Sequence, residues 1–173
     1  APDLFIVFDR VNSTDASYPK TWLYHTAAEP QIKGLEFSET SRGGKSICRT
    51  LFPKNAVYEK IGGPGRQFWS DGRNWPLPKL TPEDWGYNKR HLIPDDQWPL
   101  LGQWRMEVKP GKEAQNDYFM HLIQVGDESL SKLPKTETFE NETSMGVEFK
   151  YGEKKYHVAF DKTSDFGCKI TLK

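Results

Sequence analysis

Four side chains that suit the binding of an acidic sugar lie within ten residues of one another. They are Arg66, Trp69, Arg73 and Trp75, with Asn74 beside the last two. The flat face of tryptophan can pack on a sugar ring, whereas arginine pairs with carboxylate or sulfate groups. For any single tryptophan, however, we favour the interpretation that it holds a long loop against the protein, because tryptophan is highly buried on average. We expect at least one aromatic side chain of this segment to be exposed.

Among the four histidines, His25 is the best placed for metal ligation or proton transfer, because it ends a short strand-like run next to a loop. One histidine does not make a metal site, since a catalytic zinc takes about three protein ligands. His121 alternates with Phe119 and Ile123 on an apolar face. This pattern predicts a core histidine whose hydrogen bonds are satisfied within the protein.

Several common catalytic motifs are absent from the sequence. There is no GxSxG nucleophile elbow, no HExxH zinc motif and no GxxxxGK[ST] phosphate loop. Two acid pairs, Glu83 with Asp84 and Asp95 with Asp96, contain the carboxylates that a glycosidase needs. Adjacent acids in a loop are usually only solvated, however. The residues by themselves therefore favour sugar binding over an identifiable catalytic reaction.

The secondary structure around these side chains is predicted to be β-strand. Apolar and polar residues alternate in Arg105–Lys109, Tyr118–Val125 and Val147–Tyr151, and no segment of a dozen residues has helical spacing. The continuous apolar run Leu4–Phe8 predicts a strand that is buried on both faces. Glycine, proline, asparagine and aspartate separate the runs. We therefore predict one all-β domain over residues 1–173, an antiparallel β-sandwich or a fold close to it.

The segment from Gly62 to Gly102 interrupts this alternation with many prolines and four tryptophans, Trp69, Trp75, Trp85 and Trp98. A loop of this length is uncommon in a compact domain and is often functional. Its cations include Lys89 and Arg90 as well as the arginines named above. We expect this long Trp/Pro-rich loop to be the part of the chain that reaches a glycan.

The overall composition excludes some classes of protein. The 24 Lys and Arg residues balance the 24 Asp and Glu residues, whereas a nucleic-acid-binding surface normally carries a basic excess. No apolar run approaches the roughly 18–20 residues of a membrane span, and the first residues lack the pattern of a signal peptide. Cys48 and Cys168 could pair in an oxidising compartment or remain small buried side chains.

Five groups of residues, taken in order, carry a resemblance that spans nearly the whole chain. They are Phe5–Val11 (FIVFDRV), Lys20–His25 (KTWLYH), Gly62–Gly65 with Phe68 and Trp69, Gly102–Val108 (GQWRMEV) and Phe119–Val125 (FMHLIQV). In this order they resemble the C-terminal β-rich region of heparinase II/III-type polysaccharide lyases. The resemblance does not distinguish heparin, heparan sulfate, alginate or another uronic-acid polymer as the substrate.

This resemblance implies a layout in which an N-terminal α/α toroid precedes antiparallel β-sheets. Such lyases remove the C5 proton of a uronic acid and expel the 4-O-linked sugar by β-elimination, with tyrosine and histidine as acid and base. In the family these residues come mainly from the toroid and from a histidine early in the first β-region. We therefore expect this chain to be a non-catalytic portion that supports the N-terminal catalytic domain, contacts an acidic polysaccharide, and is periplasmic or secreted.

The resemblance also implies a structural zinc that is held by histidine and aspartate. His25, in the W-x-x-H context, is the position that matches this role, and the remaining ligands would lie upstream, so we expect the chain alone to bind zinc weakly. Two other functions remain open. The chain could be a stand-alone carbohydrate-binding module, or a structural interaction domain that docks through an exposed aromatic patch.

Overall fold

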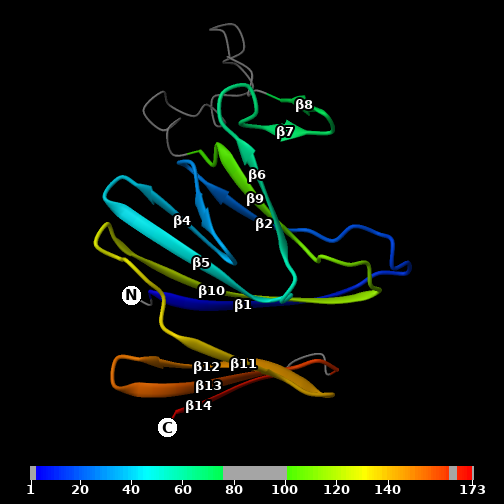
Figure 1. Ribbon diagram of the computed structural model, residues 1–173, viewed down its shortest axis with the longest axis vertical. Helices are drawn as coiled ribbons and strands as arrows, with labels where there is room; N and C mark the ends of the chain where they lie inside the picture. The colour runs from blue at the N-terminus through cyan, green and yellow to red at the C-terminus, as the bar shows by residue number, and fades with distance from the viewer. Residues whose placement is uncertain (1–2, 76–100, 164–166, 173) are drawn as a thin grey trace, which may run out of the picture.

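The structure, a computed structural model, describes residues 3–75, 101–163 and 167–172, and every regular element in these ranges is a β-strand (Figure 1). The strands are β1 (Leu4–Asn12), β2 (Trp22–Thr26), β3 (Gln31–Lys33), β4 (Glu36–Ser41), β5 (Gly44–Phe52), β6 (Val57–Gly62), β7 (Trp69–Ser70), β8 (Arg73–Asn74), β9 (Trp104–Lys109), β10 (Asn116–Asp127), β11 (Thr136–Glu140), β12 (Ser144–Tyr151), β13 (Lys154–Asp161) and β14 (Cys168–Leu172). All of their pairings are antiparallel. The predicted all-β, sandwich-like class is confirmed.

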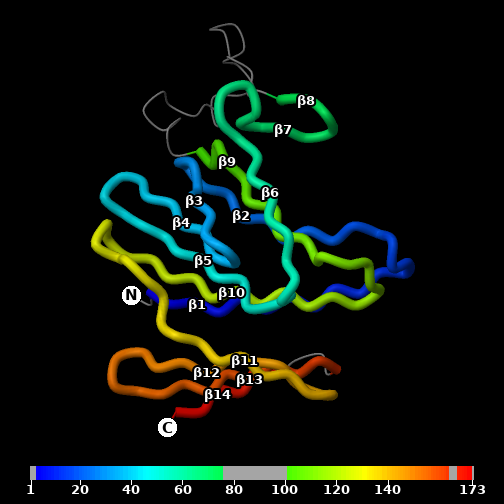
Figure 2. The backbone as a smooth tube through the Cα atoms, in the orientation of Figure 1, coloured from blue at the N-terminus to red at the C-terminus, as the bar shows by residue number. Residues whose placement is uncertain are grey.

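The strands form three layers and a hairpin. A central sheet has the order β1-β10-β5-β4-β3, a C-terminal sheet the order β11-β12-β13-β14, and a three-stranded sheet the order β2-β9-β6. Figure 1 shows the central sheet between the other two, with the β7–β8 hairpin beyond the three-stranded sheet. The chain crosses from the central to the C-terminal sheet between β10 and β11, as the tube in Figure 2 shows.

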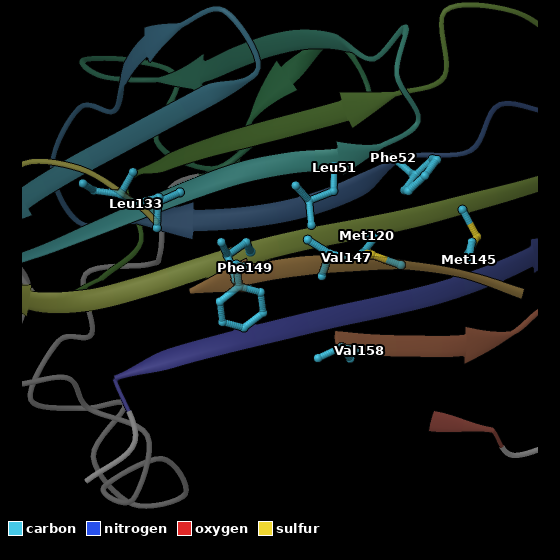
Figure 3. Close-up of a cluster of buried hydrophobic side chains, with 10 residues drawn as sticks. Leu51, Phe52, Met120, Leu133, Met145, Val147, Phe149 and Val158 are labelled. Atoms are coloured by element: carbon cyan, nitrogen blue, oxygen red, sulfur yellow. The ribbon is translucent and has the colours of Figure 1, made fainter. Parts of the chain in front are cut away.

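The larger core lies between the central and C-terminal sheets (Figure 3). Its buried members are Ile47, Leu51, Phe52, Met120, Leu122, Leu133, Met145, Val147, Phe149 and Val158. A second, smaller core of Phe37, Cys48, Met106 and Ile123 fills the space toward the three-stranded sheet. Because successive strand residues point to opposite faces, β5 and β10 supply side chains to both cores. Their two apolar faces are what make a three-layer arrangement possible.

The first strand corrects one prediction. β1 lies at the edge of the central sheet and pairs only with β10 among the described strands. Leu4, Ile6 and Phe8 pack against the larger core, whereas Phe5 on the opposite face is 42% exposed. The prediction that Leu4–Phe8 is buried on both faces is therefore wrong. The three-stranded sheet is narrower than the central sheet, and it leaves Phe5 uncovered.

Two further questions from the sequence are answered by the fold. Both cysteines are free, Cys48 in the smaller core and Cys168 exposed on the edge strand β14. Within the described residues there is no helix long and apolar enough to cross a membrane.

Candidate functional site

The hairpin β7–β8 contains Trp69 and Arg73, and the other two residues that we predicted to contact a sugar flank it, Arg66 before β7 and Trp75 directly after β8. Trp69 pairs with Asn74 and Ser70 with Arg73 across the two short strands. The turn residues, Asp71 and Gly72, have φ angles of 51° and 76°. Two consecutive residues with positive φ form the tight turn that matches the twist of antiparallel strands, and Asp-Gly is a favoured sequence for it. The local sequence therefore encodes this hairpin directly.

Glycines connect the hairpin to the three-stranded sheet. A Cβ atom on Gly62 would lie 2.7 Å from Cδ2 of the Trp104 ring, and one on Gly63 would lie 2.9 Å from its Cζ2. Gly63 also has a φ of +78°, a conformation that favours glycine. The backbone can thus lie directly on the indole of Trp104 only because these two residues have no side chain.

Arg105 of the three-stranded sheet holds the start of the hairpin at Trp69. Arg105 in β9 donates from Nη1 to the backbone oxygen of Trp69, at 2.9 Å. Its guanidinium is itself fixed by Glu107, with 2.7 Å between Nη2 and Oε1. Desolvation would raise the pKa of Glu107, but hydrogen bonds from Lys109 and Arg105 outweigh it, and the pKa lies below its usual value. The hairpin is therefore anchored to a charged network on the outer face of β9.

The four predicted residues form two stacked arginine–tryptophan pairs. The guanidinium carbon of Arg66 lies 4.8 Å from the ring centroid of Trp69, and that of Arg73 lies 3.2 Å from the ring centroid of Trp75. Trp75 is 47% exposed, and its indole nitrogen donates to the backbone oxygen of Ser70 at 3.1 Å. The expectation of an exposed aromatic side chain is confirmed by Trp75.

These two pairs do not share one binding surface. Residues opposite each other in an antiparallel pair lie on the same face, and successive residues alternate. Trp69 therefore lies on one face of the hairpin, and Arg73 and Trp75 lie on the other. The more exposed pair, Arg73 with Trp75, has a flat apolar ring beside a cation. This combination can pack against a sugar ring and attract its acidic group.

His25 lies at the same end of the three-stranded sheet as the hairpin attachment. It is exposed in β2 and pairs in register with Arg105, the residue that holds Trp69. The backbone of Gly102 passes close by, since a Cβ atom there would be 2.9 Å from the Cβ of His25. Among the described residues, no group of three or more His, Cys, Asp or Glu side chains could hold a metal ion. A zinc role for His25 remains a prediction.

His121 is a core residue, as its position in the sequence predicted. It is fully buried, its ring stacks on Trp22 at 3.7 Å between centroids, and Nδ1 lies 3.2 Å from Oγ1 of Thr50. Its Nε2 atom has no hydrogen-bond partner within the described residues, so the predicted full satisfaction is not found. Burial lowers the pKa of His121 to about 3, and burial also raises that of nearby Cys48. These two groups are a neutral part of the core.

Some predictions concern residues outside the described part of the chain. Trp85, Lys89, Arg90 and Trp98 all lie there, together with both acid pairs named above. Conversely, the structure shows a pocket of about 250 Å³ that sequence reasoning missed, between the central and C-terminal sheets. Its cations come from β3, β5 and the segment after β5, so no short motif contains them.

A second groove of about 390 Å³ lies where the C-terminal sheet extends past β1. It is lined mainly by apolar side chains such as Ile6, Val158 and Ile170. It has few of the polar groups that orient a sugar, and we do not place a site there.

The sequence matches no model of a known protein family, and no curated protein is significantly similar to it. The resemblance to heparinase II/III-type lyases therefore remains a hypothesis that rests on the residues quoted for it.

Proposed function

We propose that this chain is the non-catalytic β-sheet portion of a heparinase II/III-like polysaccharide lyase, periplasmic or secreted, that acts with an N-terminal catalytic toroid. In this role the three layers form a rigid support, and the β7–β8 hairpin contacts an acidic, uronic-acid-containing polysaccharide. The chemistry of β-elimination belongs to the toroid. The contribution of this chain is to position and bind the polymer.

The observation that carries the proposal is the Arg73–Trp75 pair. The Trp75 ring is 47% exposed, and its orientation is fixed by the hydrogen bond to Ser70 and by the stacked guanidinium of Arg73. An aromatic ring that is already fixed loses little conformational freedom when a ligand packs on it. The adjacent arginine would select sugars that carry a carboxylate or sulfate.

The attachment of the hairpin supports the same role. Its backbone is fixed to Trp104 through Gly62 and Gly63 and to the Arg105 network through Trp69. Binding groups that are mounted on rigid elements keep their geometry better than groups on free loops. The sheet residues quoted in the family resemblance, Gly62–Gly65 and Gly102–Val108, are thus the ones that hold the hairpin in place.

Calorimetric titration with uronic-acid oligosaccharides, from alginate and from heparan sulfate, tests the binding. We expect Trp75→Ala to weaken binding roughly tenfold, which corresponds to about 1.4 kcal/mol. Tyr18→Ala is the matched control, because Tyr18 is an equally exposed aromatic side chain in the β1–β2 connection. Equal affinity of the two variants would contradict a role for the hairpin.

Mixing separates the supporting role from the alternatives. The chain is combined with the toroid polypeptide, and the absorbance of the unsaturated uronate product is measured. Restored lyase activity supports the proposal. Glycan binding without restored activity favours a stand-alone carbohydrate-binding module, and loss of both favours a structural interaction domain. New absorbance with this chain alone would make it an independent lyase.

A further inference from the structure

The pocket of about 250 Å³ lies between β11 of the C-terminal sheet and the β4–β5 side of the central sheet. Leu35 and Leu51 give it an apolar wall, and polar side chains line the rest. Its volume is somewhat below the roughly 300–1,000 Å³ that is typical of small-molecule sites. The space therefore suits one charged group with a single ring rather than several residues of a polymer.

The charges around this pocket do not balance. Lys33, Arg49 and Lys54 line it, and Glu36 is the one carboxylate among the lining residues. Glu36 forms an ion pair with Arg49, with 2.5 Å between Oε1 and Nη2 and 2.7 Å between Oε1 and Nε. In the described part of the chain neither lysine forms an ion pair. Two positive charges of the pocket thus lack a counter-charge in contact.

The ammonium group of Lys54 is held in place although the residue as a whole is exposed. It donates a hydrogen bond to Oγ1 of Thr138 and lies 4.4 Å from the centroid of the Phe52 ring. Partial desolvation lowers the pKa of Lys54, and the more distant Glu140 offsets only part of this effect. A partly dehydrated cation without an ion pair gains strongly from an anion placed beside it.

Two threonine hydroxyls complete the pocket as hydrogen-bond donors. Oγ1 of Thr136 accepts from Nη1 of Arg49 at 3.2 Å, and Oγ1 of Thr138 accepts from Lys54. A hydroxyl that accepts from a cation keeps its own hydrogen available to donate. The residues described by the structure offer neither hydrogen an acceptor. Cations and hydroxyl donors around one small space are the arrangement that binds an oxyanion.

We propose that this pocket binds the oxyanion group of an acidic sugar, a carboxylate or a sulfate ester, through the ammonium groups of Lys54 and Lys33 and the hydroxyls of Thr136 and Thr138. The oxyanion site stands on the geometry of the pocket itself, whereas the choice of an acidic sugar rests on the proposed function. The pocket is lined on one side by Thr136 and Thr138 of β11, and Figure 2 shows β11 at the opposite end of the molecule from the β7–β8 hairpin. It is therefore a second contact point, separate from Trp75.

Nuclear magnetic resonance of the lysine side chains tests this site, with glucuronate, its neutral methyl ester, a sulfated glucose and inorganic sulfate as probes. We expect the acidic probes, but not the ester, to shift the Lys54 signals saturably and to raise the pKa of Lys54. Lys54→Gln should weaken binding about 10- to 100-fold, the effect of losing one hydrogen bond to a charged group. Lys54→Arg should retain most of the affinity.

Lys150→Gln is the control, because Lys150 is exposed on β12 and does not line the pocket. Equal affinity of the Lys54→Gln and Lys150→Gln variants, or equal binding of glucuronate and its ester, would overturn the inference. A preference for glucuronate over the sulfated glucose would identify the carboxylate as the natural group, and the reverse would identify the sulfate; either supports an oxyanion site.

The same variants separate this inference from the proposed function. If uronic-acid oligosaccharides bind through Trp75 and Lys54→Gln has no effect on them or on the small probes, the proposed function stands and the pocket inference fails. If inorganic sulfate binds at Lys54 and no uronic-acid oligosaccharide binds at all, the oxyanion site stands and the proposed function fails.

Discussion

At the scale of single residues, burial decides what a titratable group can do. His121 is central in β10, stacked on Trp22, with one ring nitrogen bonded to Thr50 and the other without a partner in the described structure. Burial lowers its pKa to about 3, so His121 is neutral near neutral pH. Tyr58, which bonds the same Thr50 hydroxyl at 2.6 Å, has its pKa raised to about 12 by burial. Neither group is suited to proton transfer near neutral pH.

The burial of His121 predicts that the folded protein loses stability in acid. Below its ordinary pKa of 6.5 the unfolded histidine binds a proton, whereas the folded one does so only near pH 3. Between these two pH values the unfolded state binds more protons than the folded state. The free energy of unfolding therefore decreases as the pH is lowered, by up to about 1.4 kcal/mol per pH unit. His121→Leu should flatten this slope in urea unfolding between pH 6.5 and 4. An unchanged slope would show that other groups cause the sensitivity.

At the scale of elements, the β7–β8 hairpin depends on a close approach of backbone to side chain. Gly63 and Gly65 have φ angles of +78° and +77°, but only Gly63 faces the Trp104 ring. A Cβ atom on Gly65 would meet nothing within 4 Å. Gly65 is therefore required only for its positive φ, whereas Gly63 is required both for its positive φ and because a side chain would collide with the Trp104 ring.

Replacing each glycine by alanine should reveal this difference. Both variants carry the cost of a left-handed conformation, about 1 kcal/mol. Gly63→Ala should cost about 1–3 kcal/mol more, because its methyl group overlaps the Trp104 ring. It should also change the fluorescence of the protein and weaken oligosaccharide binding through the displaced hairpin. Similar free energies of unfolding for the two variants would argue against the close packing on Trp104.

At the scale of the whole molecule, long-range contacts tie the layers together. Lys20 precedes β2 of the three-stranded sheet, and Asp117 lies in β10 of the central sheet. Their side chains are 6% and 10% exposed, and Nζ lies 3.0 Å from Oδ2. A nearly buried ion pair adds little net stability, but removal of one partner leaves an uncompensated charge.

Lys20→Met should therefore destabilise the protein by about 3–5 kcal/mol, since the carboxylate of Asp117 stays buried without its cation. The double variant Lys20→Met with Asp117→Leu should recover most of this loss. Chemical denaturation of the wild type, the two single variants and the double variant gives the coupling energy. Purely additive effects would mean that the pair is not coupled in the folded protein.

The candidate sites differ in how far the sequence could predict them. Arg66, Trp69, Arg73 and Trp75 were found because they are close in the chain, and a hairpin with an Asp-Gly turn arranges them as two pairs on different faces. The strand register was needed to show which of these side chains share a face of the hairpin. The pocket was missed because Lys33, Arg49, Lys54 and Thr138 belong to four separate segments.

The strands of this protein could largely be predicted from the amino-acid sequence alone. The alternation of apolar and polar residues predicts strands such as β9, β10, β12 and β13, since that period reports which residues share a face. The composition also gives a formal net charge of zero and a content of 13% aromatic residues.

The pairing of the strands and the contents of the space between the sheets became known only from the folded structure. Alternation reports the faces of a strand but not its partners, because strand pairing joins residues that are far apart in the chain. For this reason the exposure of Phe5 at a sheet edge, the lack of a partner for Nε2 of His121 among the described residues and the uncompensated charge of Lys54 could not be read from any local pattern. Each follows from the packing of one sheet against another.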